Sequence, residues 1–145
     1  MPEQIPLMES CIQVTTDLNA LTDVLQWFDQ FALPPLSKDF LWQCRVVLTE
    51  GFTNAVRHAH SHLPSGTLID LEMKLFTDYL EIKIWDQGEL FDWEGTLLAI
   101  SQEEVDPLEK EGGRGLMFIK QLTDYVGYDR FFDKKNCLTL HKKLH

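Results

Sequence analysis

The sequence predicts an α/β two-layer sandwich, in which helices cover one face of a mixed, mostly antiparallel sheet. Two stretches within the first 60 residues carry apolar side chains at helical spacing. From residue 67 onward the chain contains two pairs of alternating segments, each pair joined by a short turn, as antiparallel hairpins require. The chain has 145 residues, 44% of them hydrophobic, and no linker or internal repeat. We therefore expect residues 1–145 to form a single domain around one core.

The N-terminal part predicts one short strand and two helices. Residues 11–14 fit a strand, and Thr16 or Asp17 can then cap a helix that ends at the next pair of prolines. Ser37 can cap a second helix, which continues to about His60. The apolar stripe of the second helix consists of Leu41, Cys44, Leu48, Phe52, Ala55 and Ala59.

A hairpin is predicted next. Residues 67–76 alternate between apolar and polar side chains, and residues 79–85 repeat the alternation after a tight turn at Thr77 and Asp78. Because side chains of a strand point to opposite faces in turn, one face of the hairpin should join the core. The residues of that face are Ile69, Leu71, Met73 and Leu75 in the first strand, and Leu80, Ile82 and Ile84 in the second.

The last part of the chain predicts a loop, a helix and a second hairpin. Residues 87–111 are acidic and weakly periodic, so we expect a mobile loop with one helical turn inside it. Helical spacing returns over 116–126. Strands at 128–132 and 137–143 should pair around a turn at 133–136.

Composition and charge disfavour several functions. A formal net charge of −10 argues against direct nucleic-acid binding, which needs a basic surface. The thiols Cys11, Cys44 and Cys137 lack the spacing of a zinc site or a disulfide framework, so we expect reduced thiols in a cytoplasmic protein. No apolar run is long enough for a transmembrane helix. The start, Met1–Ser10, has acids where a signal peptide needs basic residues.

The second predicted helix carries a polar row. Glu50 and Asn54 are four residues apart and share one face, and His58 continues the row. A carboxylate there can act as a general base, and an amide oxygen is a hard, neutral ligand that suits Mg²⁺. The same spacing also fits a solvated helix face. A zinc site is not expected, because helix positions two apart point away from each other and zinc sites use other spacings than that of His58, His60 and His62; His60 and His62 should be exposed at the helix end.

A carboxylate and a glycine end the strand at 79–85. The Asp86 carboxylate can accept a hydrogen bond from an exocyclic amine such as that of adenine. Gly88 has no Cβ, so a flat ring can approach its backbone. An ordinary turn at the end of a strand would use the same two residue types.

Glycines precede the predicted helix at 116–126. Gly112, Gly113 and Gly115 can expose backbone amides at a helix N-terminus, which favours phosphate binding, and Arg114 adds a cation. The segment does not match the P-loop or dinucleotide-binding patterns. A flexible hinge is the alternative interpretation.

In this order, the three motifs resemble those of the histidine-kinase-like (GHKL) ATPases, and most of all those of the small anti-sigma factor serine/threonine kinases. The run from Glu50 through Asn54 to His58 is similar to their N box. Asp86-Gln-Gly88 is similar to the first glycine box, and Gly113-Arg-Gly-Leu116 to the second. The resemblance covers nearly the whole chain and implies the histidine-kinase-like ATPase fold.

The resemblance implies that ATP and Mg²⁺ are the cofactors. Asn54 would hold Mg²⁺, Glu50 would be the general base and Asp86 would bind the adenine amine. Residues 92–111 would form a lid over the nucleotide, and Leu90 stands where the family often has a second glycine. The other residues that the resemblance places at the nucleotide are His58, Gly88, Gly113, Arg114, Gly115 and Leu116.

The resemblance also implies partners. Such kinases phosphorylate a serine of a STAS-domain anti-anti-sigma protein, sequester a sigma factor in the alternative state, and commonly form homodimers. We expect neither nucleic acid nor membrane as a direct partner. A non-catalytic, ATP-binding module that switches between partners is the alternative function.

Overall fold

The fold is taken from a computed structural model. It describes residues 5–31, 36–60, 62–88, 113–132 and 134–144. Within these ranges, the side chains of Phe31, His58, Ala59 and Arg114 lie outside the description. The expected lid, its helical turn and Leu90 also fall outside the described residues.

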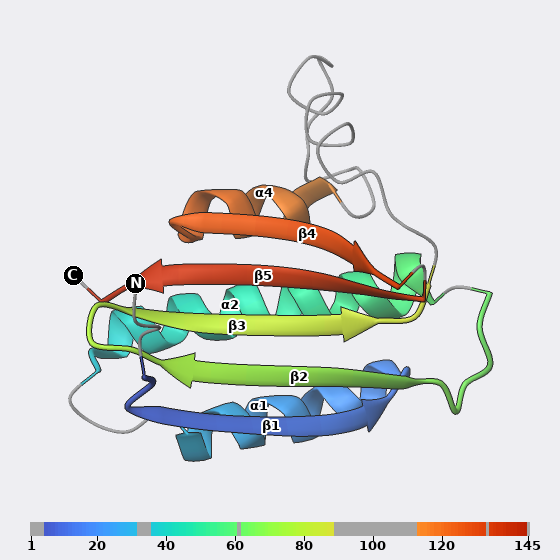
Figure 1. Cartoon of the computed structure of the whole chain (residues 1–145), viewed down its shortest axis with the longest axis horizontal. Helices are drawn as coiled ribbons and strands as arrows, with labels where there is room; N and C mark the ends of the chain where they lie inside the picture. Colours follow the sequence, from blue (N-terminus) through green and yellow to red (C-terminus); the bar gives the residue numbers. More distant parts are fainter. Residues whose placement is uncertain (1–4, 32–35, 61, 89–112, 133, 145) are drawn as a thin grey trace.

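Five strands form one sheet in the order β1-β2-β3-β5-β4 (Figure 1). Every pairing between the described strands is antiparallel, so the sheet is antiparallel throughout rather than mixed. The strand bounds are Met8–Thr15 for β1, Leu68–Leu75 for β2, Tyr79–Asp86 for β3, Tyr125–Phe131 for β4 and Lys135–Lys143 for β5.

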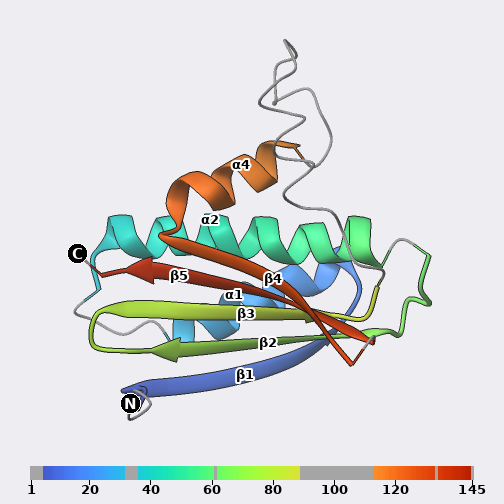
Figure 2. The ribbon, with the colours of Figure 1, turned by 45° about the horizontal axis from the view of Figure 1, so that its top comes forward.

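The helices lie together on one face of this sheet (Figure 2), which confirms the predicted two-layer sandwich. None of the helices in the described residues is long and apolar enough to cross a membrane. The helix bounds are Leu18–Ala20 for the 3-10 helix η1, Leu21–Phe31 for α1, Lys38–Asn54 for α2, Ala55–Ala59 for the π-helical turn η2, and Gly113–Leu122 for α4.

Side-chain caps begin the first two helical segments where the sequence predicts them. The Asp17 carboxylate accepts a hydrogen bond from the Asn19 amide at 2.9 Å. The Ser37 hydroxyl accepts one from the Phe40 amide at 3.1 Å. Each cap satisfies an amide that has no partner inside its helix.

The last helix lies earlier in the chain than predicted, since it begins at Gly113 rather than at Leu116. It ends at Leu122, and Tyr125 and Val126 instead begin β4, where they pair with β5. Helical spacing therefore continues past the real helix end. Pairing with a neighbouring strand satisfies the backbone just as well as a helix does, and local sequence does not reveal it.

The core lies between the helices and the inner face of the sheet. The predicted alternation of the first hairpin is confirmed, because its apolar positions are buried in β2 and β3. The fully buried large side chains of the core include Val24, Phe28, Leu48, Phe52, Ile69, Leu71, Met73, Leu80, Ile84, Leu116, Ile119 and Leu140.

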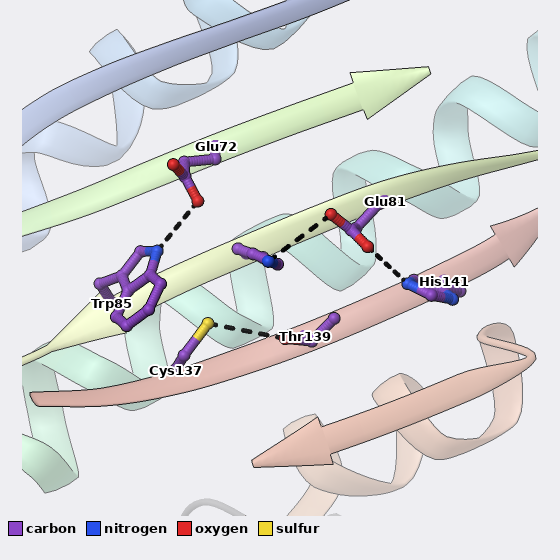
Figure 3. Close-up of polar contacts among 7 residues, drawn as sticks. Glu72, Glu81, Trp85, Cys137, Thr139 and His141 are labelled. Carbon is purple, nitrogen blue, oxygen red and sulfur yellow. Dashed lines mark hydrogen bonds and ion pairs between the residues drawn. The ribbon is translucent and has the colours of Figure 1, made fainter. Parts of the chain in front are cut away.

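The opposite face of the sheet carries polar pairs (Figure 3). The Trp85 indole nitrogen donates to Glu72 at 3.0 Å, and the Glu81 carboxylate lies 2.8 Å from the His141 ring nitrogen. Both pairs join neighbouring strands. The alternation of polar and apolar side chains thus separates an open polar face from the face that holds the core.

Candidate active site

Glu50 of α2 lies against the first turn of α4. Both Glu50 and Asn54 are half-buried on α2, and α2 packs along α4. A Cβ atom added to Gly115 would overlap the Glu50 Oε2 atom and would lie 3.3 Å from its Cδ atom. The missing side chain at position 115 therefore makes room for the carboxylate, and the first and third motifs meet in space.

The α2 helix also lies very close to the sheet beside Glu50. A Cβ atom on Gly51 would be only 2.6 Å from the Ile84 Cδ1 atom of β3. A glycine inside a helix costs about 1 kcal/mol relative to alanine, and this close approach explains its presence here. Asp86 follows Ile84 by two residues, so it points to the same side of the sheet as α2. The second motif thereby joins the other two.

The end of α2 changes its winding. After Asn54 the chain forms the π-helical turn η2, in which the His60 amide donates to the Ala55 carbonyl at 2.9 Å. Single π-turns are rare and often occur at functional sites. Asn54 is the last α-helical residue before this turn. The His58 side chain is not described, so the predicted polar row can be followed only as far as Asn54.

The Asp86 carboxylate is buried and fixed. Asp86 is only 4% exposed to solvent. Oδ1 accepts hydrogen bonds from the Gly88 amide at 3.0 Å and from the Asn136 side-chain amide at 2.8 Å. Oδ2 has a longer contact, 3.4 Å, with the Tyr128 hydroxyl. Since a buried carboxylate needs donors to remain stable, these bonds hold it in one orientation.

Three strands meet around the Gly88 carbonyl. The Asn136 amide of β5 donates to this oxygen at 2.9 Å, and the Arg130 guanidinium of β4 donates to it at 3.2 Å. Arg130 also donates to the Asn136 Oδ1 atom at 3.2 Å. The turn that leaves β3 is therefore tied to both strands of the last hairpin.

His60 approaches the same turn from the helix side. Its Nε2 atom accepts a hydrogen bond from the Gln87 amide at 2.7 Å, so Nδ1 carries the proton of the neutral ring. Nδ1 is buried and has no hydrogen-bond partner within the described part of the chain. Burial lowers the pKa of His60, and the nearby charge of Asp86 opposes this effect. The expectation that His60 is exposed is wrong, whereas His62 is exposed as expected.

Four residues of this site were missed by the sequence analysis: His60, Tyr128, Arg130 and Asn136. The sequence pattern predicts Asn136 in the hairpin turn, because asparagine is a common turn residue. It is instead a fully buried residue of β5. Asn136 has the same alternation as the core residues Leu138 and Leu140, and that signal could have placed it on the inner face.

The glycine motif before α4 is described in part. Gly113 begins α4, and the Leu116 side chain is 1% exposed in the core, so Leu116 anchors the first turn of the helix. A bound phosphate would then meet backbone amides rather than this side chain. Gly112 and the Arg114 side chain are outside the described residues.

The residues present fit Mg²⁺ bound together with a nucleotide. Within the described residues, no group of three His, Cys, Asp or Glu side chains could hold a metal by itself. Mg²⁺ bound with phosphates needs only one or two protein oxygens and keeps several waters. The half-buried Asn54 amide, one helical turn after Glu50, can supply such an oxygen.

Comparison with known proteins tests the family resemblance that the three motifs suggest. Residues 14–142 match the sequence profile of the histidine kinase-like ATPase domain. The chain belongs to this family. The family that the motifs indicate is thereby confirmed, and the antiparallel sheet with helices on one face is consistent with a histidine kinase-like ATPase fold.

This histidine kinase-like ATPase domain is similar to named serine-protein kinases. It is 36% identical over 100 residues to the serine-protein kinase RsbW of Staphylococcus epidermidis, an alignment that covers 66% of this chain and 62% of the relative. It is 34% identical over 92 residues to RsbW of Staphylococcus aureus strain MRSA252, which covers 61% and 57%. The aligned region thus spans about three fifths of these relatives.

Proposed function

We propose that this domain is an ATP- and Mg²⁺-dependent protein serine kinase of the anti-sigma factor type. The observation that carries the proposal is the place of Glu50, whose carboxylate lies against Gly115 beside the strand that ends in Asp86. The proposed catalytic carboxylate of Glu50, the Asp86 carboxylate that binds adenine and the glycine-rich start of α4 then surround one region. The similarity to serine-protein kinases supports the same activity.

In this proposal Glu50 accepts the proton of the substrate serine hydroxyl. The serine oxygen bonds to the γ-phosphorus of ATP, and the bond from that phosphorus to the bridging oxygen breaks, which releases ADP. Asn54 holds Mg²⁺, which when bound neutralises phosphate charge. The rate increase comes from positioning together with charge neutralisation, and the shared helix fixes the spacing of the Glu50 and Asn54 side chains.

The other predicted residues bind the nucleotide. Asp86 accepts a hydrogen bond from the adenine amine, and the absent Cβ of Gly88 lets the base approach. The first turn of α4, with Arg114, binds the phosphates. A local cation is needed because the protein has a net charge of −10 and ATP is itself an anion. His58 is the remaining residue that we propose to bind the nucleotide.

The proposed partners follow from the same kinase type. The phosphorylated protein is a STAS-domain anti-anti-sigma protein, and the sequestered one is a regulatory protein such as a sigma factor. We also propose a homodimer. The acidic charge supports protein partners over direct nucleic-acid binding.

A non-catalytic module that binds ATP and only switches partners is the alternative. The half-buried Glu50 favours the kinase, because binding alone requires no general base at this position. Calorimetric titration with ATP, with and without Mg²⁺, tests the shared part of both functions. Heat of binding and a raised melting temperature are expected; their absence at millimolar ATP contradicts both functions.

A further inference from the structure

We propose that Asn136 sets the base preference of this site by fixing the Asp86 carboxylate as the acceptor for a 6-amino purine. The inference rests on the proposed nucleotide-binding function and names a positioning residue that the motifs do not contain. Asn136 lies directly across from Asp86 in the register of β3 and β5. It is completely buried, so its amide has no water to replace a lost protein partner.

The Asn136 side chain connects the two residues of the second motif. Its Nδ2 atom donates to the Asp86 Oδ1 atom at 2.8 Å and to the Gly88 carbonyl at 2.9 Å. The Gly88 amide donates to the same Oδ1 atom at 3.0 Å. Two short bonds therefore occupy Oδ1, whereas the contact of Oδ2 with the Tyr128 hydroxyl is 3.4 Å long. Oδ2 therefore has more capacity than Oδ1 to accept a hydrogen bond from the amine of a purine.

Arg130 fixes which end of the amide faces Asp86. Its guanidinium donates to the Asn136 Oδ1 atom and to the Gly88 carbonyl, both at 3.2 Å. If the amide turned over, its oxygen would face the carboxylate and the carbonyl, and its NH₂ group would face the guanidinium. Only one orientation satisfies all these groups. Arg130 therefore supports the carboxylate through Asn136.

A fixed carboxylate discriminates between purines by their group at C6. It accepts a hydrogen bond from the amine of adenine, and it meets only a hydrogen in a purine that has no group there. A 6-oxo group would place a second oxygen against the carboxylate. Without the bond from Asn136, Oδ1 loses one of its two short bonds, and the carboxylate can turn to bond other donors. The preference for a 6-amino purine should then fall more than the affinity for nucleotides in general.

The test compares nucleotides that differ only at C6. Calorimetry measures the Kd of ATP, of purine riboside triphosphate, which has no 6-amino group, and of inosine triphosphate. The variants are Asn136→Leu, which is nearly isosteric and has no donor, and Arg130→Met, which keeps the apolar stem of the side chain. The control is Thr139→Val, an isosteric loss of a hydroxyl in the same strand but on the open face of the sheet.

The expected result is a loss of preference rather than a uniform loss of binding. The wild type and Thr139→Val should prefer ATP over purine riboside triphosphate, and Asn136→Leu should reduce that ratio by about tenfold, which corresponds to ~1.4 kcal/mol. Arg130→Met should reduce it by a smaller factor. Circular dichroism checks folding. If Asn136→Leu does not fold, the preference of Arg130→Met for ATP over purine riboside triphosphate decides whether the inference holds.

Three other results contradict the inference in different ways. If the folded variants keep the wild-type ratio, or lose affinity for all three nucleotides equally, Asn136 has a structural role only and the proposed function stands. If the wild type binds no ATP, the proposed function fails and the inference fails with it. If the wild type binds ATP without preference at C6, the assigned role of Asp86 and this inference are both wrong.

Discussion

The Glu50 carboxylate occupies the space that a side chain at position 115 would take. The two residues belong to different helices, and a Cβ atom on Gly115 would overlap the Glu50 Oε2 atom. A carboxylate beside the first turn of a helix is favourably placed, because the N-terminal end of a helix carries partial positive charge. The position of the proposed base and the start of α4 are therefore coupled.

Gly115→Ala tests this coupling. Alanine is the better helix former by about 1 kcal/mol, so helix propensity alone predicts a more stable protein. The contact instead forces the flexible end of Glu50 to move. We expect the variant to fold with nearly unchanged stability, measured by denaturant unfolding, and to transfer phosphate at least about tenfold more slowly, because small displacements of catalytic groups are costly.

Gly66→Ala is the matched control for this experiment. A Cβ atom added at Gly66 would have no neighbour within 4 Å. This variant should keep both its stability and its transfer rate. Equal rates for Gly115→Ala and the wild type would show that the Glu50 position does not depend on the first turn of α4.

Asp86→Asn should weaken ATP binding and flatten the preference for ATP over GTP. The carboxylate is buried and takes part in three hydrogen bonds. A hydrogen bond to a charged group contributes about 1.5–3 kcal/mol, so the Kd for ATP should rise by roughly one to two orders of magnitude. An amide can still accept one bond, and the loss can be partial. Calorimetric titration checks the result, and an unchanged Kd would return Asp86 to the role of a turn residue.

His60 should make stability depend on pH. Burial lowers its pKa from the ordinary value of 6.5, so the unfolded chain binds a proton before the folded protein does. The folded state is unaffected above about pH 6.5, and it loses stability as pH falls from 6.5 towards the lowered pKa. One histidine adds at most about 1.4 kcal/mol per pH unit to this slope. Urea unfolding between pH 7.5 and 5 measures it.

His60→Gln should remove this part of the slope, since glutamine keeps an acceptor for the Gln87 amide but does not titrate. His62→Gln is the control for the loss of an imidazole, because His62 is an exposed histidine close to His60 in the chain. Identical slopes for the wild type and His60→Gln would mean that the pKa of His60 is the same in the folded and the unfolded chain, which would contradict the effect of burial.

The three thiols should differ strongly in reactivity. Cys11 is exposed, whereas Cys44 and Cys137 are buried. Burial raises the pKa of Cys44 to about 12 and also raises the pKa of Cys137. Since the thiolate is the reactive form, iodoacetamide at pH 8 should label Cys11 first. Peptide mass spectrometry reads the order, and labelling of Cys44 in the native protein as fast as Cys11 would contradict the described burial.

The first hairpin and the starts of the first two predicted helices could be predicted because they depend on local patterns. Alternation places Ile84 inside and carries the same face on to Asp86. The caps at Asp17 and Ser37 use residues whose short side chains satisfy free amides. Each of these signals lies within a few neighbouring residues, and the structure confirms the features that they predict.

The supporting residues of the site depend on pairing across the chain. Asn136 reaches Asp86 only because β5 lies beside β3 in a particular register, and Arg130 reaches both through β4. His60 becomes buried because a π-helical turn ends α2 and directs the ring towards Gln87. Neither the register nor the turn has a local sequence signal strong enough to predict them.

The central claim is that Glu50 is a catalytic base and Asn54 a metal ligand. Glu50→Gln is nearly isosteric, so it should keep ATP binding and slow phosphate transfer by about 10²- to 10⁴-fold. Asn54→Ala should weaken both, because neutralisation of phosphate charge matters in binding and in the reaction. The two side chains are half-buried, so both variants should fold.

The most direct measurement is phosphate transfer from radiolabelled ATP to a cognate STAS-domain protein, with nucleotide titration of the same samples. The account predicts transfer by the wild type, normal ATP binding with transfer slowed by about 10²- to 10⁴-fold for Glu50→Gln, and weaker ATP binding and slower transfer for Asn54→Ala. Wild-type protein that binds ATP and transfers no phosphate to any cognate partner would contradict the kinase, and the non-catalytic partner-switching module would then be the function.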